Sequence, residues 1–83
     1  MANKQAAAPL ITGEQALAMR EKAKATQSEF WKHLGVTQSG GSRYESGRNI
    51  PTPVRLLLAL RYGSAAQKRQ ARVFIGVSDV VEQ

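Results

Sequence analysis

The stretch that decides the fold runs from residue 26 to residue 47 and reads TQSEFWKHLGVTQSGGSRYESG. Thr26 and Thr37 are each followed by glutamine, and each can cap a helix with its hydroxyl. Between the two helices lies an LGV tripeptide, whose glycine suits the left-handed conformation that ends a helix. The pattern predicts a short helix over residues 27–34, a tight turn, and a second helix over residues 38–46.

The second of these helices has little intrinsic helical preference. Its sequence, QSGGSRYES, holds two adjacent glycines, each of which costs about 1 kcal/mol relative to alanine in a helix interior. Contacts from elsewhere in the chain must therefore hold residues 38–46 in place.

Helix signals continue on both sides of this pair. Thr12 with Gln15 has the form of a capping box, and apolar residues then recur at helical spacing, which predicts a helix over residues 12–25. A threonine–proline step at 52–53 matches a cap followed by proline at the first helical position. It predicts a fourth helix over residues 52–62, ended by the glycine that follows.

The C-terminal region supports two interpretations. Ser64 can cap a short helix through Arg72, but the following VFIGVSDVV is rich in β-branched residues that alternate as in a strand. The same residues also fit a helical stripe, and we favour a strand or extended arm. The domain plan is a flexible N-terminal arm over 1–11, a helix-turn-helix domain over 12–63, and a C-terminal extension over 64–83 that serves as a dimerisation segment or packs on its own domain.

Composition restricts the partners. The 83 residues hold 12 Lys and Arg against 6 Asp and Glu, a formal net charge of +6, so we expect an anionic partner. The chain has no cysteine, no clustered metal ligands and no catalytic constellation, which predicts neither an enzyme, a cofactor, a metal site nor a small-molecule substrate. No apolar run approaches the roughly 20 residues of a membrane span, so we expect a cytoplasmic protein.

Residues 19–51 can be written M-R-x-x-x-K-A-T-Q-x-E-F-W-x-x-L-G-V-T-Q-x-x-x-S-R-Y-E-S-G-R-x-x-P. This pattern resembles the lambda-repressor and Cro type of helix-turn-helix, the XRE family, and the resemblance covers roughly residues 14–62. It implies an all-α, compact bundle of four to five helices that binds double-stranded DNA and reads the major groove with residues 38–46.

Four residues of that helix are our candidates for base contacts: Gln38, Ser39, Ser42 and Arg43. They share one face near its N-terminus. Glutamine suits the donor and acceptor pair of adenine, arginine suits guanine, and serine serves either. Without the surrounding motif these residues would be an ordinary solvated surface.

The resemblance also implies phosphate contacts from Gln27, at the start of its helix, and from Arg48 and Asn49, just after the recognition helix. Helix N-termini at residues 27 and 38 would favour anions. For Thr37 two roles stay open, a phosphate contact and the cap of its own helix.

Four residues are assigned structural roles. Arg20 and Glu45 match positions where the family pairs a first-helix arginine with a recognition-helix glutamate. Trp31 stands where the family carries a small residue and Gly41 where it carries a branched apolar one. We interpret the two departures as compensating, since removing the side chain at 41 makes room for the indole at 31.

These observations predict a sequence-specific transcriptional regulator of the repressor type, acting as a homodimer on an inverted repeat. Half-sites roughly 10 base pairs apart would match recognition helices about 34 Å apart. The alternative is an antitoxin or adaptor of the same fold, whose main task is to bind a partner protein through its C-terminal segment.

Overall fold

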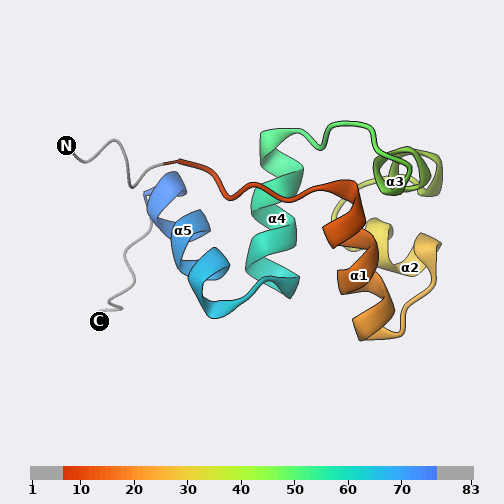
Figure 1. The fold of residues 1–83 in the computed structure, drawn as a ribbon, viewed down its shortest axis with the longest axis horizontal. Helices are drawn as coiled ribbons and strands as arrows, with labels where there is room; N and C mark the ends of the chain where they lie inside the picture. Colours follow the sequence, from red (N-terminus) through yellow and green to blue (C-terminus); the bar gives the residue numbers. More distant parts are fainter. Residues whose placement is uncertain (1–6, 77–83) are drawn as a thin grey trace.

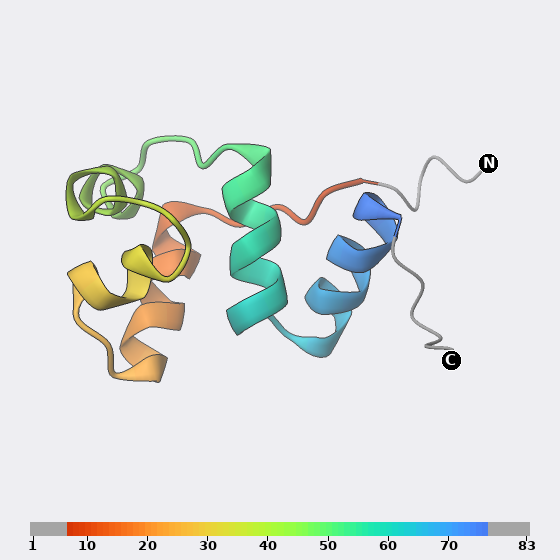
Figure 2. The same ribbon diagram turned by 180° about the vertical axis from the view of Figure 1, so that it is seen from behind.

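The computed structural model describes residues 7–76, and this part of the chain forms five helices and no strand. The helices are α1 (Gly13–Ala23), α2 (Gln27–Lys32), α3 (Gln38–Glu45), α4 (Thr52–Tyr62) and α5 (Ala65–Ile75). α2 and α1 both pack against α3, and α4 packs against α5. Figures 1 and 2 place α3 and α5 at opposite ends of the molecule, with α4 between them. The predicted all-α helix-turn-helix bundle is confirmed.

Local sequence determines where most helices begin. Three of them start with a reciprocal capping box, in which the cap hydroxyl accepts a backbone N–H and a longer side chain returns to the cap's own N–H. The pairs are Thr12 with Gln15, Thr26 with Glu29, and Ser64 with Gln67. Thr37 caps α3 by accepting the N–H of Gly40 at 3.1 Å.

The C-terminal ends of α1, α2, α3 and α5 differ from prediction by one to three residues, whereas α4 ends at Tyr62 as predicted. α1 stops at Ala23, two residues early, because Lys24 adopts a left-handed conformation with φ of 57°. α2 stops at Lys32, since the residues after it form the turn that leads to Gly35 at φ 74°.

The expected cap of α4 was wrong. Pro51 occupies the cap position, without a side-chain cap bond, and Thr52 is already helical. The Thr52 hydroxyl instead accepts a hydrogen bond from Arg55 Nη2 at 2.8 Å.

The preference for a strand or extended arm after Arg72 was also wrong, as far as the structure describes this region. Val73, Phe74 and Ile75 complete α5, and Gly76 ends it in the left-handed conformation with φ of 87°. A capping box at one end and a glycine C-cap at the other outweigh the weak helical preference of two β-branched residues. Residues 77–83, which include the rest of the predicted strand, lie outside the described residues.

The segment before α1 packs on the domain. Pro9 and Ile11 are buried, and Arg55 donates to the Pro9 carbonyl oxygen at 2.9 Å. In Figure 1 this segment crosses α4 on its way from the α5 end to α1. The expectation of a flexible arm over 1–11 therefore fails for these last residues, while residues 1–6 are not described.

Aromatic side chains form the centre of the core. Phe30 and Trp31 of α2 are fully buried, and Phe30 stacks on Tyr62 of α4 with ring centroids 4.4 Å apart. Leu58 of α4 is also fully buried. The core thus joins the α1–α3 end of the molecule to α4.

No helix in the described range 7–76 has the length and apolarity to cross a bilayer.

Candidate nucleic-acid interface

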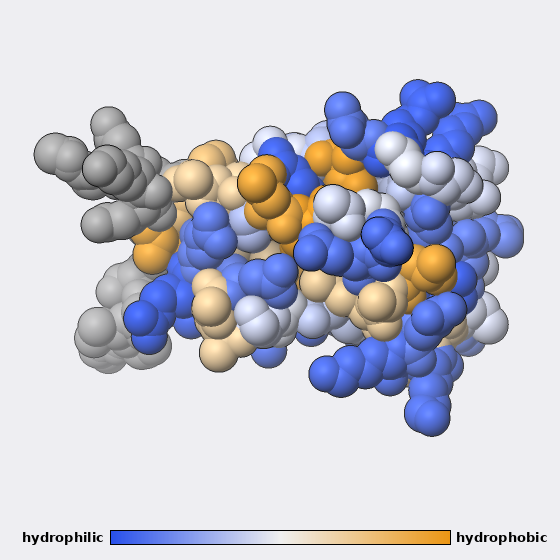
Figure 3. All heavy atoms as spheres, viewed as in Figure 1, coloured by the Kyte–Doolittle hydropathy of each residue, from blue (hydrophilic) through white to orange (hydrophobic). Residues whose placement is uncertain are grey.

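The four predicted base-reading side chains lie together on the surface of α3. Gln38, Ser39, Ser42 and Arg43 are all exposed. With Gln27 of α2 they line a shallow hollow of about 390 Å³. All five lining residues have polar side chains, and none carries a carboxylate. Figure 3 shows strongly hydrophilic side chains gathered over the end of the molecule that carries α3.

The predicted phosphate contacts surround this surface. Thr37, Arg48 and Asn49 are exposed, and Gln27 is half-buried. The Thr37 hydroxyl caps α3 by accepting a backbone N–H, and its own proton stays available to an outside acceptor. Both roles left open for Thr37 are therefore compatible with its geometry.

Arg48 lines a second shallow hollow next to the first, together with Ser42, Arg43 and Ser46. Ser46 is exposed and donates its hydroxyl to the Ser42 carbonyl oxygen at 2.9 Å. The sequence analysis did not select Ser46. Its spacing of four from Ser42, which puts both on one helix face, was the available signal.

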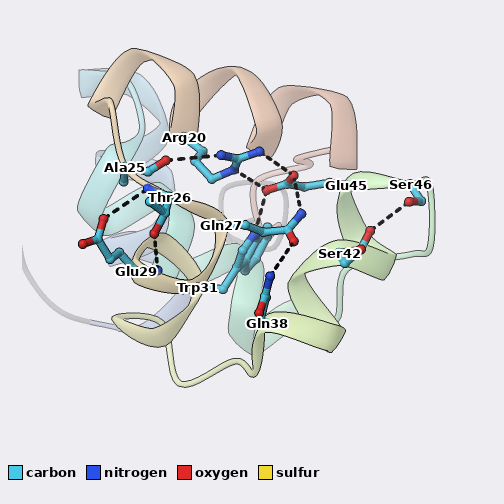
Figure 4. Close-up of polar contacts among 10 residues, drawn as sticks. All are labelled: Arg20, Ala25, Thr26, Gln27, Glu29, Trp31, Gln38, Ser42, Glu45 and Ser46. Carbon is cyan, nitrogen blue, oxygen red and sulfur yellow. Dashed lines mark hydrogen bonds and ion pairs between the residues drawn. The ribbon is translucent and has the colours of Figure 1, made fainter.

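The predicted Arg20–Glu45 pair is present and is the centre of a larger network (Figure 4). Arg20 donates from Nε to Oε2 of Glu45 at 2.8 Å and from Nη2 to Oε1 at 3.0 Å. Trp31 Nε1 donates to Oε2 at 2.7 Å and Gln27 Nε2 to Oε1 at 2.9 Å. Four donors therefore converge on a carboxylate whose side chain is 7% exposed.

This network keeps Glu45 ionised. Burial alone would raise the pKa of the Glu45 carboxyl, but hydrogen bonds from Arg20, Trp31 and Gln27 and the charge of Arg20 lower it by more, so the net pKa lies below its ordinary value. The hydrogen bond to Glu45 likewise raises the pKa of Arg20 above its ordinary value. The pair thus holds α3 against α1 through two full charges.

Trp31 and Gly41 fit together as the sequence analysis expected. A Cβ built at Gly41 would collide with Cγ, Cδ1 and Nε1 of Trp31. Both residues are buried, and the indole ring occupies the space where a side chain at 41 would lie. The absence of that side chain is what allows the Trp31 N–H to reach Glu45.

A second close approach fixes α3 from the α1 side, and sequence analysis missed it. A Cβ at Gly13 would collide with the carbonyl oxygen of Tyr44. Gly13 is the first residue of α1 and is buried. Its position directly after the Thr12 cap gave no hint of a distant backbone neighbour.

The charges around this interface are not arranged for metal binding. Within residues 7–76 no group of three or more His, Cys, Asp or Glu side chains could hold a metal ion. The side chains that line the hollow on α3 carry amides, hydroxyls and a guanidinium group, which bind bases and phosphates by hydrogen bonding.

Comparison with known proteins supports a helix-turn-helix domain in this chain. The sequence model of the RsaL-like HTH domain family matches residues 17–61, from α1 to the end of α4. No curated protein and no solved structure has significant similarity to the chain. The expected helix-turn-helix DNA-binding family is confirmed, whereas the finer assignment to the lambda-repressor and Cro type is not. The chain belongs to the RsaL-like helix-turn-helix domain family.

Proposed function

We propose that this protein is a sequence-specific regulator of transcription that reads the major groove of double-stranded DNA with α3. The observation that carries the proposal is the polar hollow formed by Gln27 and the exposed face of α3. Its amides, hydroxyls and guanidinium match the groups that recognise base edges and phosphates. The net charge of +6 favours association with a polyanion.

Within this surface, Gln38, Ser39, Ser42 and Arg43 contact bases. The side chains at the rim, Gln27, Thr37, Arg48 and Asn49, contact phosphates and set the position of α3 on the duplex. α3 begins at Gln38, so the positive end of its helix dipole lies beside the proposed contacts.

The test is selection of bound sequences from random double-stranded DNA, followed by footprinting of the enriched site. Gln38→Ala should relax the preference at one base pair and weaken specific binding by about 1–3 kcal/mol. Arg48→Ala should weaken binding to all sequences alike and reduce the salt dependence by about one counterion. If both variants act identically, the division into base and phosphate contacts is wrong, and if no sequence is enriched the function is wrong.

We further propose that the protein acts as a homodimer. One helix-turn-helix reads only a few base pairs, and a symmetric pair reads enough for a usable affinity. The support is the C-terminal end of α5, where the exposed fractions of Val73, Phe74 and Ile75 are 40%, 39% and 48%. Large apolar side chains clustered on one helical turn are typical of an interface.

Dimerisation predicts a palindromic footprint whose half-sites are one helical turn, or a multiple of it, apart. Phe74→Ser should abolish the dimer in sedimentation analysis and weaken operator binding. A wild-type chain that is monomeric both free and on DNA would exclude the dimer and favour an adaptor that uses α5 to bind a different protein.

A further inference from the structure

Two amide side chains connect the buried Glu45 carboxylate to the proposed base-reading surface (Figure 4). Gln27 donates from Nε2 to Glu45 Oε1 at 2.9 Å. Its other amide atom, Oε1, accepts from Nε2 of Gln38 at 3.5 Å. A hydrogen-bonded chain thus runs from Glu45 through Gln27 to Gln38. The last bond is the longest, so it is the most sensitive to the position of Gln27.

The charge on Glu45 gives this chain a direction. An ionised carboxylate only accepts hydrogen bonds, so Gln27 must turn its NH₂ group towards Glu45. Its oxygen is then left to face Gln38, which must respond with its own NH₂ group. Gln38 retains one N–H and its carbonyl oxygen for an outside partner. These are the donor and the acceptor that the N7 and the amino group of adenine require.

Trp31 holds the start of the chain in place. Its indole ring is fully buried, and its Nε1–H donates to Glu45 Oε2 at 2.7 Å, the shortest bond to that carboxylate. Arg20 binds both carboxylate oxygens from the α1 side. Because the indole N–H and the guanidinium only donate, both require an acceptor at position 45, and with the Gln27 amide they occupy both carboxylate oxygens with donors. Each also restricts where that group can lie.

We propose that Glu45 and Trp31, neither of which faces the exposed surface of α3, are positioning residues that determine base preference at the site of Gln38. Glu45 sets the direction of the Gln27 and Gln38 amides. The Trp31 N–H holds the other carboxylate oxygen, Oε2, and so fixes the position of Oε1, to which Gln27 donates. The inference rests on the proposed function, since it concerns how the same surface selects a base. It assigns specificity to two residues whose side chains are largely or fully buried.

Two variants interrupt the hydrogen-bonded chain at different points. The first replaces Trp31 in the full-length chain with 3-benzothienylalanine by protein semisynthesis, which keeps the shape of the ring and replaces its N–H with sulfur. The second, Gln27→Met, keeps a side chain of similar length at a half-buried position but cannot relay a hydrogen bond. Gln38→Ala identifies the base pair that Gln38 reads. Arg43→Ala identifies a base pair read by a residue that does not belong to the hydrogen-bonded chain.

All five proteins are used to select sequences from the same random double-stranded library. Preference is measured at each base pair as the ratio between the bases within one protein. A bidentate contact to adenine is worth roughly 5- to 150-fold in that ratio. In the Trp31 and Gln27 variants the ratio at the Gln38 base pair should fall by about threefold or more. In the same two variants the ratio at the Arg43 base pair should keep its wild-type value.

The ratios separate positioning from general weakening. A variant that is merely less stable binds less DNA but keeps the relative preferences of the wild type. If both variants keep the wild-type ratio at the Gln38 base pair, Glu45 and Trp31 do not position Gln38, and the proposed DNA-binding function is unaffected. If the wild-type protein enriches no sequence, both proposals are wrong. If the Gln27 variant keeps the wild-type ratio at the Gln38 base pair, the proposed hydrogen-bonded chain is wrong, even if the Trp31 variant fails to fold.

Discussion

α3 and α5 lie at opposite ends of the molecule and are stabilised in opposite ways. α3 has two glycines in eight residues, and its position depends on Trp31, on the Glu45 network and on the close approach of Gly13. α5 has a capping box, a glycine C-cap and good helix formers, and fully buries only Ala71. The difference indicates that the position of α3 depends on contacts from the rest of the domain, whereas the bounds of α5 are specified by its own sequence.

The largest expected effect comes from removing the centre of the α3 network. Glu45→Ala leaves the buried N–H of Trp31 without its acceptor and the partly exposed guanidinium of Arg20 with only the Ala25 carbonyl oxygen, and breaking such a pair costs about 3 kcal/mol. The free energy of unfolding, measured in urea, should fall by this amount. Glu21→Ala, which removes an exposed carboxylate from α1, is the control and should stay within about 0.5 kcal/mol of the wild type.

A smaller loss is expected from adding a methyl group beneath α3. Gly41→Ala places a Cβ against the indole of Trp31, and such overpacking costs about 1–3 kcal/mol, more than the helical preference of alanine returns. Gly40→Ala is the matched control, because its Cβ would meet only Val36 and Thr37 side-chain atoms, at 3.1 and 3.3 Å. Equal urea midpoints for the two variants would show that Trp31 does not fill the space beneath Gly41.

The Glu45 network also predicts a dependence on pH. The folded-state pKa of Glu45 is lowered from 4.5, so its contribution to stability is fully present above the unfolded-state pKa and is lost as pH falls through the folded value. The unfolding free energy of the wild type should therefore decrease as pH falls below about 5. Protonation keeps the side chain in place, so the loss should be smaller than that of Glu45→Ala.

Glu45→Gln isolates this contribution. The pKa of exposed Glu29 is also lowered, mainly by its hydrogen bonds with Thr26, so the wild-type profile contains both groups. The difference between the wild-type and Glu45→Gln profiles removes the part due to Glu29. Parallel profiles over the acid range would mean that Glu45 has the same pKa folded and unfolded.

The start of each helix could be predicted where a side chain near in sequence determines it. Thr12, Thr26, Thr37 and Ser64 all cap as their sequence patterns indicate. The Arg20–Glu45 pair was available only through the family resemblance, because nothing local links residues 25 positions apart. The bonds from Trp31 and Gln27 to that carboxylate, and the contact of Gly13 with Tyr44, depend on how the helices pack, and they were not predicted.

In α5 the difficulty was local, because two patterns in the same stretch of sequence predicted different structures. Two competing periodicities over Val73 to Val77 could not be separated, and the preferred one was wrong for the described residues. The balance was decided by the ends of the helix, where Ser64 and Gly76 satisfy backbone groups that β-branched residues in the middle cannot. Weighing the caps above the alternation would have given the observed helix.

The smallest effect should therefore come from the cap of α5. Ser64→Ala removes the acceptor for the Gln67 N–H, which costs about 1 kcal/mol, and Ser64→Asp should restore most of it. Hydrogen exchange should become faster in the first turn of α5, while α3 amides keep their protection, because few fully buried contacts tie α5 to the domain. Equal loss of protection in α3 and α5 would show instead that the two ends unfold as one unit, and that the local signals of α5 contribute to holding α3 in place.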